Sequence, residues 1–125
     1  MRLSLVIATI AALQGAAGVA LAAAAAHVDA NPLLATASQF LMIHACAGLA
    51  LAALARTSPP ATRWLCGGAF ALQAGVTLFS ADLAARVYLG GKLFAFAAPS
   101  GGGLTIIAWL TLAAWGAFSA LQSRS

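Results

Sequence analysis

Four long apolar runs constrain this chain more than any other feature of its sequence. They cover approximately residues 3–26, 32–55, 63–83 (or as far as 88) and 104–121. Crossing a hydrocarbon core of about 30 Å takes roughly 20 apolar residues. Charged residues make up only 6% of the chain, against about 25% in a typical soluble domain, and could not cover a water-facing surface. The sequence therefore predicts an all-α polytopic membrane protein, with four transmembrane helices in a compact bundle that forms a single domain over residues 1–125.

Polar and turn-forming residues separate the four runs. Asn31 is a good N-cap residue, and Pro32 fits the first turn of the second helix. Residues 56–60 end in two prolines, and residues 90–92 contain two glycines, so both segments are expected breaks. Residues 93–98 are apolar but too short to span. We expect them to form a short interfacial segment, followed by a further break at residues 99–103 before the fourth helix.

The placement of basic residues predicts the orientation in the membrane. Lys and Arg are enriched in cytoplasmic loops. Four spans place the two termini and the second loop on one side, and this side holds four of the six basic residues: Arg2, Arg56, Arg63 and Arg124. Arg86 and Lys92 fall on the other side. We therefore expect a bacterial-type inner (plasma) membrane protein with both termini in the cytoplasm.

Three polar side chains lie near the centres of three predicted spans: Gln14, His44 and Gln73. An ionisable residue inside the membrane is a functional hypothesis by default. A neutral His44 could ligate haem, hydrogen-bond a quinone or relay protons. The interpretation we favour is a dry midplane polar layer, in which the two glutamines supply the donor and acceptor that His44 needs and hold the helices together.

Asp82 and Arg86 are four residues apart with the acid first, which is the favourable order for an ion pair on a helix. Near the outer interface the two charges would neutralise each other, and we favour this structural pair. The alternative is that Asp82 is a transport-coupling carboxylate, since ion and proton carriers use such groups.

The glycine-rich segment before the predicted fourth helix is a candidate contact for an anion or a lipid headgroup. Successive backbone N–H groups in such a segment can cradle a phosphate. The residues concerned are Gly101, Gly102, Gly103 and the nearby Lys92. The alternative, which we favour, is that these glycines allow a tight turn and close packing against a neighbouring helix.

Small residues recur at four-residue spacing in every predicted span, and such residues let helix backbones approach in lipid. They predict a tight bundle without a large central cavity. The residues with this spacing are Ala16, Ala20 and Ala24; Gly48 and Ala52; Gly67, Ala71 and Gly75; and Ala113 and Ala117.

Several of these landmarks together resemble a known family. Pro99 is followed by Ser100, two glycines and, ten residues after the proline, Trp109, with Ala108 where the family has glycine. Residues 78–83 read Leu-Phe-Ser-Ala-Asp-Leu, and His27 follows Ala26. The chain resembles, over nearly its whole length, the small membrane proteins of domain of unknown function 423, which include the eukaryotic transmembrane protein 256 group.

The resemblance implies a four-helix membrane protein and supplies no established reaction. His44 matches a histidine in the family's second helix. The chain departs from the family pattern where Phe40 and Leu41 replace a Tyr-Gln pair, and where Asp82 and Ala84 replace a serine and a tyrosine. If the family has a polar site on its second helix, these departures imply that this chain lacks part of it.

The sequence does not favour an enzyme. It contains no nucleophile–base pair, paired carboxylates or nucleotide-binding motif, so we expect no catalytic residue and no cofactor. His27 and Asp29 are too few to predict a metal site. The chain has no glutamate, in contrast to the small four-helix multidrug exporters. The chain also lacks the run of basic residues that would predict nucleic-acid binding.

We therefore expect a non-catalytic small membrane protein, or an accessory subunit of a membrane complex. Its expected partners are the lipid bilayer and either other membrane subunits or further copies of itself. One alternative is a transporter or channel for a small solute or ion. A second alternative is a haem- or quinone-associated redox protein that acts through His44.

Overall fold

Four long helices make up the fold, and the computed structural model describes residues 1–124. They are α1 (Arg2–His27), α2 (Pro32–Thr57), α3 (Thr62–Tyr88) and α4 (Ala97–Gln122), with a short 3-10 helix, η1 (Pro59–Ala61), between α2 and α3. Helices of 26 or 27 residues extend about 39 Å at 1.5 Å per residue. All four are long and apolar enough to cross a membrane. The predicted all-α fold with four membrane-spanning helices is confirmed.

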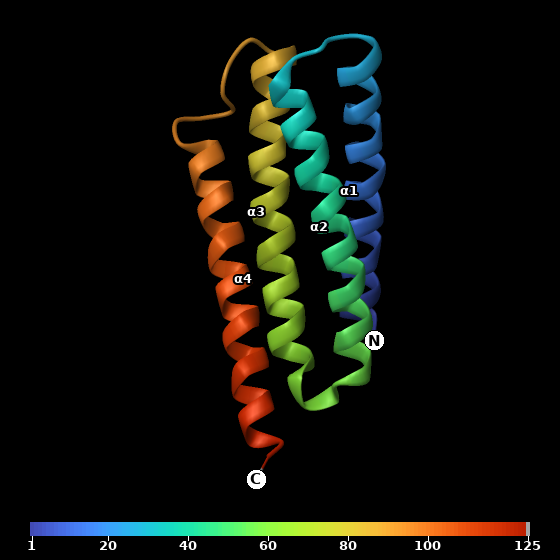
Figure 1. Cartoon of the computed structure of the whole chain (residues 1–125), viewed down its shortest axis with the longest axis vertical. Helices are drawn as coiled ribbons and strands as arrows, with labels where there is room; N and C mark the ends of the chain where they lie inside the picture. Colours follow the sequence, from blue (N-terminus) through green and yellow to red (C-terminus); the bar gives the residue numbers. More distant parts are fainter. Residues whose placement is uncertain (125) are drawn as a thin grey trace.

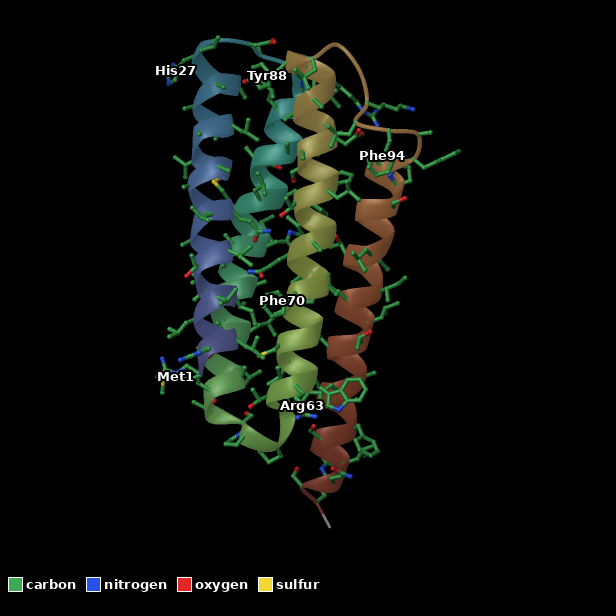
Figure 2. The ribbon with its side chains drawn as sticks, turned by 180° about the vertical axis from the view of Figure 1, so that it is seen from behind. Met1, His27, Arg63, Phe70, Tyr88 and Phe94 are labelled. Carbon is green, nitrogen blue, oxygen red and sulfur yellow. The ribbon has the colours of Figure 1, made fainter. Side chains whose placement is uncertain are left out.

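The helices run alternately up and down, so that both termini and the α2–α3 connection lie at one end (Figure 1). Met1 and Arg63 mark this end, whereas His27 and Tyr88 lie at the other (Figure 2). Helix α1 packs against α2 and α3. Within the described chain, α4 packs closely against α3 alone, and it therefore forms the outer edge of the bundle.

Local sequence signals define the ends of α2. The Asn31 side chain accepts a hydrogen bond of 2.9 Å from Leu33 N, and Pro32 occupies the first turn, where no N–H is needed. At the other end, the Thr62 hydroxyl donates to Ala55 O at 2.9 Å. This bond satisfies one of the last carbonyl groups of α2 and joins α2 to the start of α3.

The fourth helix begins earlier than predicted. It starts at Ala97 rather than near residue 104, so the predicted break at residues 99–103 is wrong. The predicted interfacial segment at 93–98 is shorter than expected, because its last two residues, Ala97 and Ala98, belong to α4. Pro99 is the third helical residue, and proline is tolerated there because the first N–H groups of a helix have no intrahelical partner. The loop covers only residues 89–96 and turns through Gly90 and Phe96, both with positive φ.

The α3–α4 contact depends on two glycines that face each other. A Cβ atom added to Gly101 would lie 2.6 Å from Phe79 N and 2.7 Å from Gly75 O. One added to Gly75 would lie 2.7 Å from Gly101 O and 2.6 Å from Thr105 Oγ1. No side chain fits between backbones this close, so glycine is required on both helices.

The small residues that mediate packing are only partly those selected by their spacing. Gly48 and Ala52 of α2 are buried as expected, and Gly75 faces α4. Helix α1 instead approaches α2 through Gly18, whose added Cβ would lie 3.1 Å from Ser38 O. Several of the selected residues are exposed because four-residue spacings recur on every face of an alanine-rich helix: Ala16, Ala20, Gly67, Ala113 and Ala117.

Candidate functional site: buried polar groups of the helices

Gln14, His44, Gln73 and Asp82 are all buried, and they lie in three separate groups rather than in one midplane layer. Gln14 and Gln73 lie together between α1 and α3. His44 of α2 faces Trp109 of α4. Asp82 lies near the end of α3, beside the α3–α4 loop.

Gln14 and Gln73 join α1 to α3 by three hydrogen bonds. Gln14 Nε2 donates to Gln73 O at 3.1 Å and to Thr77 Oγ1 at 3.0 Å. Gln73 Nε2 donates to Ile7 O at 2.9 Å. Both glutamine side chains are buried. Bonds of this kind in membranes contribute about 0.6–2 kcal/mol each, so together they are a substantial part of what holds these helices in register.

The amide oxygens of the same two glutamines have no partner. Gln14 Oε1 and Gln73 Oε1 are buried, and neither accepts a hydrogen bond from any described residue. Rotating the Gln73 amide by 180° would not help, since it would place Oε1 against the Ile7 carbonyl, which is also an acceptor. A buried acceptor without a donor costs about 1–3 kcal/mol. The α1–α3 seam therefore has two unused acceptors.

His44 uses both of its ring nitrogens. Nδ1 lies 2.6 Å from Phe40 O in the preceding turn, and Nε2 lies 3.2 Å from Trp109 Nε1. A carbonyl oxygen can only accept and an indole N–H can only donate. The ring must therefore be neutral with its proton on Nδ1, which it donates to Phe40 O, while Nε2 accepts from Trp109.

The predicted hydrogen bonds from His44 to Gln14 and Gln73 are wrong. The two glutamines lie in the seam between α1 and α3, whereas His44 is on the side of α2 that faces α4. The prediction that the three side chains meet rests on their similar depths in their spans. Depth alone does not specify which way a side chain points around its helix axis.

Trp109 is the partner that the sequence reasoning missed. It lies twelve residues after the first residue of α4, and His44 lies twelve residues after the first residue of α2. Both helices start at the same end of the bundle (Figure 1). The hydrogen bond of 3.2 Å between the two rings shows that the side chains meet at a similar depth. The prediction that the fourth helix begins near residue 104 puts Trp109 only five residues into it, so the sequence does not indicate that Trp109 and His44 meet. Two phenylalanines, Phe40 and Phe79, complete an aromatic group around the imidazole.

Both carboxylate oxygens of Asp82 are occupied. Oδ2 accepts from Arg86 Nε at 3.0 Å and from Arg86 Nη2 at 2.7 Å. Oδ1 accepts from Leu93 N at 2.8 Å. The Asp82 side chain is fully buried, whereas that of Arg86 is 30% exposed. Asp82 thus joins the last turns of α3 to the loop that leads to α4.

The glycines of the candidate headgroup contact do not form an anion cradle. Gly101, Gly102 and Gly103 lie inside α4, so their N–H groups point to the carbonyl groups of the preceding turn. That prediction is wrong for the three glycines, and so is the alternative of a tight turn. Close packing holds for Gly101, whereas Gly103 has no neighbour within 4 Å. Lys92 is exposed in the loop, and its contact with a headgroup stays a prediction.

Two grooves lie along the α1–α3 seam, and Ile10, Thr77 and Ala81 line both of them. The first has a cavity volume of about 490 Å³ and includes Gln14 and Ala17 in its lining. The second, also of about 490 Å³, includes Gln73 and Phe70. Their walls are mostly apolar, so these grooves can accommodate hydrocarbon.

The hydrogen bonds of His44 occupy both ring nitrogens through which it could coordinate a metal or haem iron. A metal would need the Nε2 lone pair that accepts from Trp109, or the Nδ1 position that now carries the proton. Among residues 1–124, no three His, Cys, Asp or Glu side chains lie close enough to hold a metal ion.

The model of the family described as Protein of unknown function (DUF423) matches residues 7–102 of this chain. The chain belongs to the DUF423 family. The matched segment contains all of α2 and α3, and with them His44, Gln73 and Asp82. It ends within the first turns of α4, so the DUF423 match includes Gly101 but not Trp109. No curated protein and no solved structure matches the chain.

Proposed function

We propose that this chain is a non-catalytic protein of a bacterial-type inner membrane that serves as an accessory subunit of a larger membrane complex. The observation that carries the proposal is that the two side chains best suited to proton transfer or ligand binding inside the spans, His44 and Asp82, already have their partners. Asp82 has partners at both oxygens, and His44 has partners at both nitrogens. A group that transfers protons or binds a substrate must be able to exchange partners, whereas these hold the helices together.

The position of α4 supports the accessory role. It packs closely against α3 alone among the described helices, and its outer face carries large exposed side chains such as Ile106 and Leu110. In an accessory subunit this face contacts another membrane protein. Helix α1 also has exposed apolar residues, including Leu13 and Val19, and provides a comparison face on the same molecule.

Site-specific photocrosslinking in native membranes tests this proposal. A photoreactive amino acid placed at Ile106 or Leu110 should give one or a few discrete protein adducts, which mass spectrometry can identify. The same amino acid at Leu13 or Val19 should give mainly lipid adducts. Lipid adducts alone from all four positions would contradict the accessory role.

The two alternatives make different demands on His44 and Asp82. A transporter needs a hydrated path to one of them, so proton or solute flux in liposomes that depends on either side chain would favour it. A haem- or quinone-associated redox protein needs a cofactor beside His44. A Soret band in the natively purified protein that disappears with His44→Gln would favour haem.

A further inference from the structure

We propose that the groove between α1 and α3 binds a lipid-soluble alcohol, whose hydroxyl group donates a hydrogen bond to Gln14 Oε1. The site does not depend on the accessory role proposed above. Three observations carry it: an apolar groove of about 490 Å³ that Gln14 lines, the unpaired and covered amide oxygen of that same side chain, and the depth of Gln14 in the span.

The groove selects an apolar body. Its lining comes from α1 and α3, with Leu41 of α2 also contributing, and includes Ile10, Leu13 and Ala17. Only Gln14, Thr77 and Ser80 bring polar atoms to it. A hydrocarbon chain can therefore lie along the groove without leaving polar groups unpaired.

The unused acceptor selects a donor. Gln14 is 95% buried, since only 5% of its surface is exposed, and its amide nitrogen already donates to Gln73 O and Thr77 Oγ1. What it still offers is the oxygen, which can only accept. A hydroxyl group satisfies this oxygen, whereas a ketone, an ether or an ester has no proton to donate. The site therefore distinguishes an alcohol from its ether or its oxidised form.

The depth of Gln14 limits the kind of alcohol. Gln14 lies near the middle of the 26-residue α1, so it is close to the bilayer centre. The headgroup of a phospholipid lies at the surface and does not reach this depth. A long-chain or isoprenoid-type alcohol, which can lie within the hydrocarbon core, fits both the depth and the groove.

The α1–α3 seam is also where the bundle can adapt to such a ligand. Gly18 allows close backbone contact between α1 and α2, and Gly75 allows it between α3 and α4. Helices α1 and α3 are instead joined by side-chain hydrogen bonds. The Gln14 oxygen is covered in the structure. In the proposed complex the groups that cover this oxygen move aside, and the ligand hydroxyl takes their place.

A matched pair of photoreactive probes tests the site on the purified full-length chain in lipid nanodiscs. One probe is a long-chain alcohol that carries a diazirine, and the other is its methyl ether. We expect the alcohol to label peptides of α1 and α3 about fivefold more than the ether, the preference that one hydrogen bond of ordinary strength provides. Gln14→Leu should reduce the labelling by the alcohol to that by the ether.

Two further variants keep the test decisive if Gln14→Leu does not fold. Ala17→Phe fills the groove without touching the hydrogen bonds, and it should reduce labelling by both probes. Leu49→Phe on an exposed face of α2, outside the groove lining, should leave labelling unchanged. Equal labelling by alcohol and ether in the wild type would overturn the proposal. It would also be overturned by a preference that survives Gln14→Leu, or by crosslinks between two copies of the chain at this groove.

Discussion

Asp82 has the least exposed charged side chain of the described chain, and its two oxygens have different roles. Oδ2 neutralises Arg86, whereas Oδ1 accepts from the backbone of Leu93 and holds the loop. The two partners differ in exposure, since Arg86 is 30% exposed and Asp82 is fully buried. An orphaned Arg86 can therefore still reach water, but an orphaned Asp82 cannot.

We predict from this asymmetry that Arg86→Ala destabilises the protein more than Asp82→Ala. Removing one partner of a buried pair costs about 3–5 kcal/mol, and the full cost applies only where the remaining charge stays buried. Adding Asp82→Ala to Arg86→Ala should therefore recover part of the loss. The stability of each variant is measured as its free energy of unfolding in mixed micelles. Asp82→Asn is the control, because an asparagine oxygen can still accept from Leu93 N. Strictly additive losses in the double-mutant cycle would contradict the pairing.

Helix α4 has few neighbours, so its position depends on a small number of contacts. Gly101 and Gly75 allow its backbone to approach α3, and the Thr105 hydroxyl, which donates to Gly101 O at 2.8 Å, lies in the same contact. Farther along the helix, Trp109 reaches across to His44 of α2. These contacts lie on one side of α4, and the other sides are exposed apolar surface.

We predict that Gly101→Ala displaces α4 from α3, because the new methyl group would overlap the backbone at Phe79 and Gly75. Overpacking of this kind costs about 1–3 kcal/mol. The matched control is Gly103→Ala, which meets no atom within 4 Å and should gain up to about 1 kcal/mol from the higher helix propensity of alanine. Unfolding in detergent, followed by Trp fluorescence, should show a loss of stability for Gly101→Ala and no loss for Gly103→Ala. Equal effects at both positions would contradict the close α3–α4 contact.

The whole molecule has an asymmetric distribution of charge along its long axis. Arg2, Arg56, Arg63 and Arg124 lie at the end that holds the termini and the α2–α3 connection (Figures 1 and 2). Asp29 and Asp82 lie at or near the opposite end together with Arg86 and Lys92, so the formal charges there cancel. The up-and-down arrangement of the helices brings together basic residues that are far apart in sequence. From the positive-inside rule we predict that this basic end faces the cytoplasm.

Thiol labelling in intact cells checks this orientation. The background variant replaces Cys46 and Cys66 with alanine, and single cysteines then replace Asp29 or Ser58. A membrane-impermeant reagent added outside should label position 29 and leave position 58 unlabelled until the cells are opened. Labelling at 58 but not at 29 in intact cells would show that the orientation is reversed.

The sequence by itself determined the features that depend on length, apolarity and near neighbours in the chain. Four apolar runs of sufficient length require four spans, the Asn31-Pro32 pair specifies the start of α2, and the spacing of Asp82 and Arg86 places them on one face of any helix. The sequence leaves the role of Pro99 open, because proline both ends helices and occupies their first turn. The structure places it in the first turn of α4.

Only the tertiary structure decided which faces meet. Alanine and leucine surround each span almost uniformly, so the pattern does not indicate the rotation of a helix about its axis, and in lipid an apolar residue is tolerated on either side. That rotation directs His44 to Trp109 instead of Gln14, and it brings Gly75, rather than Gly67, against α4. It also leaves the amide oxygens of Gln14 and Gln73 without donors, because an orphaned acceptor depends on the packing of several helices at once.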